Sequence, residues 1–534
     1  MIEMQVGLLT LLKEFDAICR KHDITYYLEG GSLLGAVRHK GFLPWDDDVD
    51  LSMTRDNFQK LLKVIDQELP ENRELYCYER FPNYMRDTVK YTNLDTTVLF
   101  RNHILDGNAA GQHIDVFILD PVPSDPAAQA EYKRYATVYS ELLTPVYVLC
   151  DEICEHMDLY EQYRKMMEEQ GREPVLAMLR EKLFTYEDSE ECDTYLLRWG
   201  NRHIFYPKAL FGAPVRLPFE DGMFPAPSQY YRFLRRQFGD SWMIVPDASN
   251  QEDHNTFDNY HIPCKTFIQD YASFIHYDAF RADNEIRKKH NLQLLKEKVR
   301  EQKLHVASSA ILHDMDLSYL TSALSTEAQE MLQQERYEDL VRYFEPYHCA
   351  QLWAPYIQEG VALSVDPAVL HTCAWAFTMC GKFGQAEKLI KASKVDTPEI
   401  WELMDMILDI RACVLAAEES RYEDAKLLAE KWHSRCPAQL TLGVFAIRQA
   451  IRENGDPVCL AERVQTLLGY YPENDELLFL MAVLMEKLGK DEEAVSWYRR
   501  CLAVTRNGLL MMEMPRLPDE ETGDSESDAM EKKG

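Results

Sequence analysis

The sequence predicts an α/β (α+β) domain with a mixed sheet, followed by an all-α domain of helical repeats. Two observations carry this prediction. Up to Leu119, a helical pattern, a strand pattern, a glycine turn, a second strand, a second helix and further strands follow one another, an order typical of α/β domains. Beyond about Leu317 the character of the chain changes, and three segments resemble one another.

Length and charge limit the classes of protein to consider. A chain of 534 residues is long enough for more than one domain. Its formal net charge of −31 argues against a general nucleic-acid binder, because phosphate backbones are bound by positive surfaces. No run approaches the ~18 apolar residues of a membrane span, and the N-terminus lacks a signal-peptide pattern. The sequence therefore predicts a cytoplasmic protein without a transmembrane segment, either free or peripheral at the inner face of the membrane.

The thirteen cysteines are scattered along the chain and form no CxxC pair. The closest two, Cys150 and Cys154, fall on a predicted helix. An odd count without framework spacing predicts reduced, mostly buried thiols. A structural zinc site stays open as an alternative.

Hydrophobic spacing predicts the first elements in order. Val6 to His22 carries an apolar stripe at helical spacing, and Ile24 to Leu28 is predicted as a strand. Glycines at 30 and 31 end that strand before a short helix over Leu33 to Arg38. Asp48 to Met53 is predicted as a second strand, and Thr54 as the cap of a helix over Arg55 to Glu68.

Further along, strands are predicted near Tyr84 to Tyr91, Thr96 to Arg101 and Gln112 to Leu119, and a helical region over Tyr132 to about Asn201. Phe211 to Tyr231 is rich in Pro, Phe and Gly, which favours ordered loop with short strands. Phe267 to His305 is charged and helical in pattern. The predicted divisions are a catalytic domain over 1–265, a helical linker over 266–316, helical repeats over 317–505 and an acidic, disordered tail over 506–534.

Three similar segments begin at Gly381 (GKFGQAEKLI), Ser420 (SRYEDAKLLA) and Gly489 (GKDEEAVSWY). Their small residues Ala386, Ala425 and Ala494 are 39 and 69 positions apart. The second gap is close to two periods of ~34 residues, the spacing of tetratricopeptide-type helix pairs. Cys459 falls where a hidden middle repeat would place its small residue. The pattern predicts stacked helical hairpins that bury a face on their neighbours.

Four aspartates crowd into five positions: Asp46, Asp47, Asp48 and Asp50. On a strand, Asp48 and Asp50 would share one face, an arrangement that can bind one or two Mg²⁺ ions, with Mn²⁺ as a second choice. The alternative is a solvated acidic turn. The apolar and aromatic setting, which includes Trp45 and Val49, favours the metal site.

A third carboxylate belongs in such a site, and Asp115 is the best candidate. Ile114, Val116 and Ile118 share one side of a predicted strand and leave Asp115 on the other. The alternative is that Asp115 pairs with an Arg or Lys. Asp120 is predicted as a turn residue before Pro121.

Gly30, Gly31 and Ser32 supply N–H groups and a hydroxyl near a helix start, which suits a phosphate. This is neither a P-loop nor a GxGxxG fingerprint. The candidate partners for phosphate charge are Arg38, Lys40 and Lys90. For each, a solvated surface role is an equal alternative. His39 is a weaker candidate, and His103, His113, His254 and His261 show no ligand spacing.

The string EGGSLLGAVRHKGFLPWDDDVDLSM from Glu29 resembles the LicD family, which includes the fukutin-type proteins. The resemblance extends to VKYTNLDTTVL from Val89, to HIDVFILD from His113, and to the stretch from Phe211 to Pro246. It covers roughly residues 5 to 262. Phe238 replaces the usual Tyr of the last stretch, and the fifteen residues between Ser32 and Asp48 are typical of LicD-like members.

The resemblance implies a nucleotidyltransferase-like fold in which Gly31, Ser32, Asp48, Asp50 and Asp115 match the Gly-Ser turn, the D-x-D strand and the third carboxylate. It also implies transfer of a phosphorylated alcohol, such as phosphocholine, from a CDP-linked donor to a glycan, with release of CMP. Metal held by Asp48, Asp50 and Asp115 would neutralise the donor diphosphate. Asp46 or Asp115 is the predicted general base.

We expect the acceptor to be a glycan or a polysaccharide precursor of the lipopolysaccharide or teichoic-acid kind. The helical repeats would bind a protein partner or a membrane-bound acceptor complex. Two other functions stay open. One is nucleotidyl transfer, with attack on the phosphorus next to the nucleoside. The other is a non-catalytic scaffold that only binds nucleotide and acts through its helical repeats.

Overall fold

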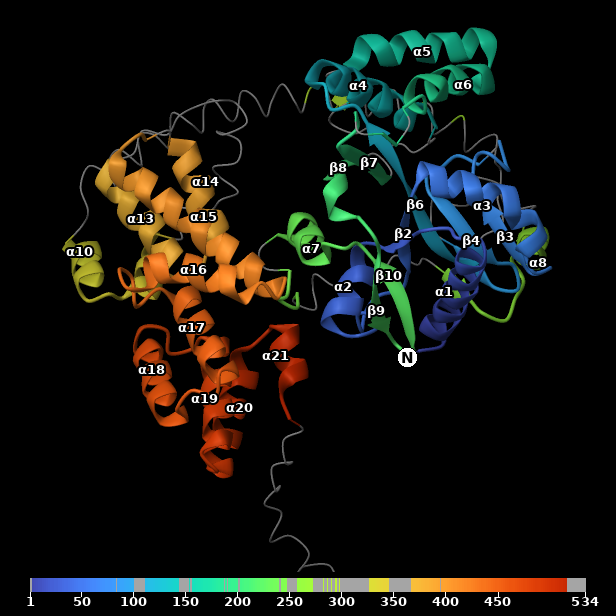
Figure 1. Cartoon of the computed structure of the whole chain (residues 1–534). Coiled ribbons are helices and arrows are strands. Elements are labelled where there is room, and N and C mark those ends of the chain that lie inside the picture. The colour runs from blue at the N-terminus through green and yellow to red at the C-terminus, as the bar shows by residue number, and fades with distance from the viewer. Residues whose placement is uncertain are drawn as a thin grey trace, which may run out of the picture. The chain divides into compact units, whose positions relative to one another are not determined.

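A computed structural model describes most of the chain (Figure 1). The described residues are 2–99 except 83, 111–143, 153, 156–199 except 187 and 190, 202–246 except 240 and 241, 257–271, 326–344 and 366–515 except 394, with six single positions between 282 and 297. They form two compact units. The first contains the residues up to Trp242 and those from Pro246 to 297, and the second contains Met243–Val245 and the residues from Thr326 onward.

A mixed sheet is the framework of the first unit. Its strands are β1 (Tyr27–Leu28), β2 (Asp50–Thr54), β3 (Arg73–Tyr76), β4 (Val89–Asn93), β6 (Gln112–Val122), β7 (Thr194–Trp199) and β8 (Arg202–Pro207). The order is β1-β2-β6-β4-β3, and β7 joins the far end of β6 and pairs with β8. The β2–β6 pair is parallel. Long strand β6 therefore contacts three neighbours and lies at the centre of the sheet.

Two smaller strand pairs complete the β-structure of this unit as described. They are β9 (Val215–Phe219) with β10 (Gly222–Ala226), and β5 (Thr97–Leu99) with β11 (Phe257–Asn259). The first pair confirms the short strands predicted between Phe211 and Tyr231.

Helices pack around the sheet. They are α1 (Glu3–Lys21), α2 (Gly30–Arg38), α3 (Arg55–Glu68), α4 (Pro126–Leu143), α5 (Met157–Gln170), α6 (Arg172–Leu183), α7 (Tyr230–Phe238) and α8 (Cys264–Tyr271), with a 3₁₀ turn at Lys208–Leu210. The apolar stripe predicted on α1 is buried. Helix α3 spans the predicted residues, and the Asn57 N–H donates to the Thr54 hydroxyl, which confirms the cap.

The prediction of a helical region from Tyr132 to about Asn201 is wrong at its end. Helices α4, α5 and α6 share one apolar cluster, but Thr194–Trp199 and Arg202–Pro207 form β7 and β8. Leu196 and Leu197 are buried because β7 pairs with β6. This pairing partner is more than seventy positions away, so the local pattern did not reveal the strands. Strand β3 was also not predicted.

Asp120 is a strand residue, and the predicted turn before Pro121 is wrong. It lies inside β6 and is only 1% exposed. Arg55 Nε lies 2.7 Å from Asp120 Oδ1, and Arg198 NH2 lies 2.8 Å from Oδ2. Burial alone would raise the pKa of Asp120, but these two guanidinium groups lower it overall. The carboxylate is a buried ion-pair centre that joins β6, α3 and β7.

The second unit consists of helices in its described part, apart from a single bridge between Ile244 and Asn507. The helices are α10 (Thr326–Gln333), α11 (Tyr337–Phe344), α13 (Pro367–Met379), α14 (Phe383–Ser393), α15 (Pro398–Glu418), α16 (Tyr422–His433), α17 (Leu440–Arg452), α18 (Pro457–Tyr470), α19 (Asp475–Lys487), α20 (Asp491–Val504) and α21 (Gly508–Glu513). Asp366 and Asp456 cap helices whose first residue is proline, a combination that favours a helix start.

The predicted small residues of the repeats pack as expected at three of four positions. Ala386, Ala425 and Ala494 are buried on α14, α16 and α20. Cys459 on α18 is exposed, and its neighbour Leu460 is buried instead. The placement of Cys459 at a packed position is therefore wrong.

Most of the charged stretch from Phe267 to His305 lies outside the described residues, as do Cys150, Cys154, His103 and His254. Helix α21 lies within the range predicted as tail, and residues beyond 515 are not described.

Among the helices that the structure describes, none combines the length and the apolar character needed to cross a membrane.

Candidate active site

Asp50 and Asp115 lie on neighbouring strands at one level of the sheet. The parallel register of β2 and β6 places their Cα atoms opposite each other. The Asp115 N–H donates to the Val49 carbonyl (2.9 Å), and the Asp50 N–H donates to the Ser32 hydroxyl (2.9 Å). The first bond joins β6 to the residue before β2, and the second ties the start of α2 to the start of β2. The structure thus brings together Ser32, Asp50 and Asp115, three of the predicted site residues.

Helix α2 begins at Gly30, not at Leu33 as predicted, so the glycines form its first turn. Gly30 has φ of +52°, and a Cβ there would lie 3.0 Å from Asp50 Oδ2. A Cβ on Gly31 would lie 2.9 Å from Asp46 Oδ2. Two carboxylates therefore lie close to this backbone, so a side chain at either glycine would require a carboxylate to shift, and the positive φ of Gly30 also favours glycine.

Asp48 lies just before β2, which begins at Asp50. The predicted start of this strand at Asp48 is therefore two residues too early. Asp48 nevertheless acts on Asp50 electrostatically. Burial is the main cause that raises the pKa of Asp50 well above its usual value, and the charges of Asp48, Asp115, Asp46 and Glu29 raise it further.

A divalent cation fits this cluster by charge and by donor type. Several carboxylates share one partly buried place, and carboxylate oxygens are the ligands that Mg²⁺ prefers. Within the described residues, however, no three acidic, histidine or cysteine side chains are gathered as a metal site. The Asp115 carboxylate instead contacts a lysine. The residues therefore suit a hard cation chemically, without forming its coordination shell in this structure.

That lysine is Lys90, which lies opposite Asp115 in the β4–β6 register, with 3.2 Å between Lys90 Nζ and Asp115 Oδ1. The Lys90 ammonium also contacts Nε2 of His113, whose Nδ1 lies 2.8 Å from the Gly111 carbonyl. Because only an N–H can pair with a carbonyl, Nδ1 carries the proton and Nε2 accepts from Lys90. Burial and the Lys90 charge lower the pKa of His113 to about 4.

Arg38 is buried on the last turn of α2, and its NH1 donates to the Trp242 carbonyl (3.1 Å). Burial lowers the pKa of Arg38 to about 10, although the Asp46 charge acts in the other direction. Lys40 donates to the Val37 carbonyl (3.0 Å). Burial and Arg38 lower the pKa of His39 to about 4. Among the predicted phosphate partners, Lys90 directly contacts a predicted catalytic carboxylate, Asp115.

Sequence reasoning missed Glu29, His113 and Tyr206. Glu29 is buried, and its N–H donates to the Asp50 carbonyl (2.9 Å). Burial raises the pKa of Glu29 to about 8, although hydrogen bonds from Ser52, Tyr206 and Gly30 lower it. The position of His113 two residues before Asp115 on the same strand was an available signal. Tyr206 lies 177 positions from Glu29, and no local pattern indicates it.

Comparison with known proteins agrees with this geometry. Residues 23–122 match the family model described as LicD/FKTN/FKRP, nucleotidyltransferase domain. The lipopolysaccharide cholinephosphotransferase LicD of Haemophilus influenzae is 26% identical over 278 residues, which cover 48% of this chain and 97% of the relative. The ribitol 5-phosphate transferase FKRP of Homo sapiens is 63% identical over 30 residues, 6% of each chain. An uncharacterised protein of Rickettsia prowazekii is 35% identical over 86 residues, 16% of this chain and 31% of the relative.

The matched range includes Gly30, Gly31 and Ser32, the aspartate cluster, Lys90 and Asp115. It also includes the parallel β2–β6 pair that sets the two central carboxylates side by side. The resemblance noted in the sequence is confirmed over residues 23–122, where the chain is similar to the nucleotidyltransferase domain of LicD, FKTN and FKRP.

Proposed function

We propose that this chain is a Mg²⁺-dependent phosphotransferase that moves a phosphorylated alcohol from a CDP-linked donor to a hydroxyl group of a glycan or polysaccharide precursor and releases CMP. The observation that carries the proposal is the Asp50–Asp115 pair beside the glycine start of α2, within the range that matches the LicD-type domain. The names of the relatives support the reaction class, since one is a cholinephosphotransferase and another a ribitol 5-phosphate transferase.

In this proposal Asp48, Asp50 and Asp115 hold Mg²⁺, for which Mn²⁺ can substitute. The metal would offset charge on the donor diphosphate and on the departing CMP. The raised pKa of Asp50 supports the assignment. Burial raises it most and the charges of Asp48, Asp115 and Asp46 raise it further, and a cation placed among these carboxylates would favour their charged forms.

The chain's own residues supply the remaining steps. Gly30, Gly31 and Ser32 bind and orient the donor at the start of α2, and Lys90 and Arg38 provide positive charge for phosphate oxygens. Asp46 or Asp115 receives the proton of the attacking hydroxyl as general base. Of these, Lys90 has the strongest structural support, because it is buried and already contacts Asp115.

We further infer that the second unit is a set of tetratricopeptide-like hairpins that binds a protein partner or a membrane-bound acceptor complex. Consecutive helices pack against each other in the pairs α13–α14, α15–α16, α17–α18 and α19–α20. The buried alanines on α14, α16 and α20 support a repeated unit, because each lets a neighbouring helix approach closely.

We place the reaction in the cytoplasm. Every cysteine in the described part of the chain is a free thiol. Free, largely buried thiols are typical of reducing compartments.

The test is product analysis with the purified full-length chain and a glycan acceptor. CDP-choline, CDP-ribitol and CDP-glycerol are incubated in turn with Mg²⁺, and CMP release is measured, with EDTA and Asp50→Asn as matched controls. We expect CMP from at least one donor and none in either control. Pyrophosphate released from a nucleoside triphosphate, without CMP from any donor, would indicate nucleotidyl transfer instead. Binding of the donors without any turnover would indicate a scaffold.

A further inference from the structure

A pocket of about 220 Å³ lies within the second unit and shares no residue with the carboxylate site. Its wall includes His371 and Trp375 of α13, Glu399 and Glu402 of α15, and Trp432 and Arg435 at the end of α16. Pockets for drug-sized ligands measure ~300–1,000 Å³. This pocket is smaller, so its size suits a ligand of only a few heavy atoms.

Aromatic rings form two of its sides. His371 and Trp375 lie one helical turn apart and stack, with ring centroids 6.0 Å apart and an interplanar angle of 16°. Trp432 is buried, and its Nε1 donates to Asp409 Oδ2 (2.8 Å), which fixes the ring. Both indoles are thus held in place, and indole is the side chain that attracts cations most strongly through its face.

The charges of the wall sum to minus one. The Arg435 guanidinium lies 5.0 Å from the Trp432 ring centroid and forms an ion pair with Glu402. These two groups offset each other, so Glu399 supplies the remaining charge. His371 adds no charge near neutral pH. Burial lowers its pKa, although the charges of Glu399 and Glu402 act in the opposite direction.

The contact between Arg435 and Trp432 shows that this wall already binds a cation with an aromatic face and a carboxylate together. Trp375 and Glu399 offer the same two kinds of group to the pocket. A guanidinium is weakly hydrated, and so is a methylated ammonium. A methylated ammonium therefore loses little hydration free energy when it moves from water to an aromatic wall.

We propose that this pocket binds a small organic monocation with a methylated ammonium head, held against Trp375 and balanced by Glu399. This ligand site does not depend on the transfer reaction proposed for the first unit.

Isothermal titration of the full-length chain with choline tests the proposal, and 3,3-dimethylbutan-1-ol serves as the neutral probe of the same shape. We expect choline to bind at least roughly tenfold more tightly than the alcohol, because only the cation gains from the rings and the carboxylate. Equal binding of the two probes, or no binding of choline, would overturn the proposal.

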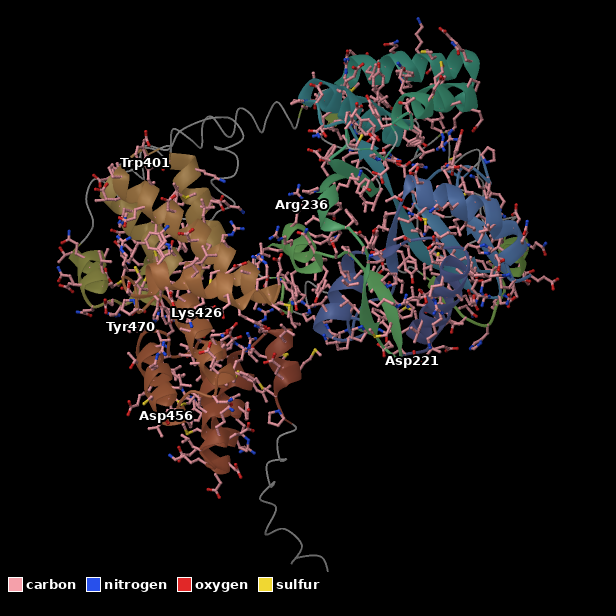
Figure 2. All side chains as sticks on the ribbon, viewed as in Figure 1. Asp221, Arg236, Trp401, Lys426, Asp456 and Tyr470 are labelled. Atoms are coloured by element: carbon pink, nitrogen blue, oxygen red, sulfur yellow. The ribbon has the colours of Figure 1, made fainter. Side chains whose placement is uncertain are left out.

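Variants locate the bound choline. Trp375→Leu and Glu399→Gln should each weaken choline binding by roughly fivefold or more, and Glu399 is exposed, so its variant should fold. Trp401→Leu is the matched control, since Trp401 lies on α15 with Glu399, is 58% exposed and is not among the residues that line the pocket. Figure 2 labels Trp401. Asp50→Asn should leave binding unchanged. If choline binding survives Glu399→Gln but is lost in Asp50→Asn, choline binds to the first unit, and the proposed site is refuted.

Discussion

Lys90 on β4 and Asp115 on β6 form an ion pair across antiparallel strands, with 3.2 Å between Nζ and Oδ1. The sequence left open whether Asp115 is a metal ligand or the partner of a basic residue. The structure shows the second arrangement, and it places the pair directly beside Asp50. In the proposed reaction Asp115 would serve both roles, because it would hold the metal while Lys90 pairs with a phosphate oxygen of the donor in place of Asp115.

Replacing Lys90 tests this view. We expect Lys90→Met to raise the KM for the CDP-linked donor by roughly tenfold or more, because second-layer partners of a metal ligand typically matter to that extent. Lys90→Arg should retain part of the activity. Lys13→Met removes an exposed lysine paired with Asp221 and should change nothing, since exposed pairs contribute little. Steady-state kinetics of CMP release provide the measurement, and an unchanged KM in Lys90→Met would contradict a role in donor binding.

Asp50→Asn should separate stability from activity. Burial, and after it the charges of neighbouring carboxylates, raise the pKa of Asp50, so an amide that cannot ionise removes the cost of placing a charge there. We expect transfer to fall to background, while the free energy of unfolding in EDTA at pH 7.5 rises by about 1 kcal/mol. Chemical denaturation followed by circular dichroism measures the second quantity. A less stable variant in EDTA would show that the carboxylates do not repel one another.

Elements with a strong local signal were predicted well from the sequence. Helix α3 and its Thr54 cap follow from one amphipathic stretch, and the buried face of α1 follows from its apolar stripe. Asp115 was identified because Ile114 and Val116 alternate with it. In each case the information lies within a few residues of the element.

Pairings between distant segments were not predicted, because no local pattern encodes them. Strand β7 is stable through its contact with β6, and the Tyr206 hydroxyl reaches Glu29 from a strand far along the chain. The start of β2 at Asp50 is another case. The bond from the Asp50 N–H to the Ser32 hydroxyl fixes this point, and a sequence pattern places strand ends only within a few residues.

Gly30→Ala tests the close approach of Asp50. The new methyl group would lie 3.0 Å from Asp50 Oδ2 on a residue with φ of +52°. Gly171 has φ of +86°, and a Cβ there would meet nothing within 4 Å, so Gly171→Ala is the matched control. Both variants should lose on the order of 1 kcal/mol of stability or more, because each places a Cβ on a residue with positive φ. Only Gly30→Ala should also lose transfer activity per folded molecule, and equal activity in the two variants would refute the proposed fit.

Glu29 gives the first unit a pH-dependent stability. Its pKa is raised from 4.5 to about 8, chiefly by burial, so between these values the folded state keeps a proton that the unfolded state releases. The contribution of Glu29 to stability is therefore largest below about pH 4.5 and is lost as the pH rises through 8. Glu29→Gln should remove this fall, which we expect to be on the order of a few kcal/mol. Urea denaturation in EDTA at pH 5, 6.5 and 8 measures the free energy of unfolding of each variant. Glu168→Gln is the control, because Glu168 is exposed. A parallel decline in the wild type and Glu29→Gln would exclude Glu29 as its source.

The last prediction concerns the helical unit. Ala425 is fully buried on α16, whereas Cys459 is exposed on α18 although the repeat period aligns the two positions. We expect Ala425→Leu to destabilise the second unit by roughly 1–3 kcal/mol, because added methylenes overpack a filled interface. Cys459→Leu should stay within about 0.5 kcal/mol of the wild type, as surface changes usually do. Thermal denaturation of the two variants compares them directly. Equal losses would mean that α18 packs through Cys459 after all, as the strict repeat period predicts.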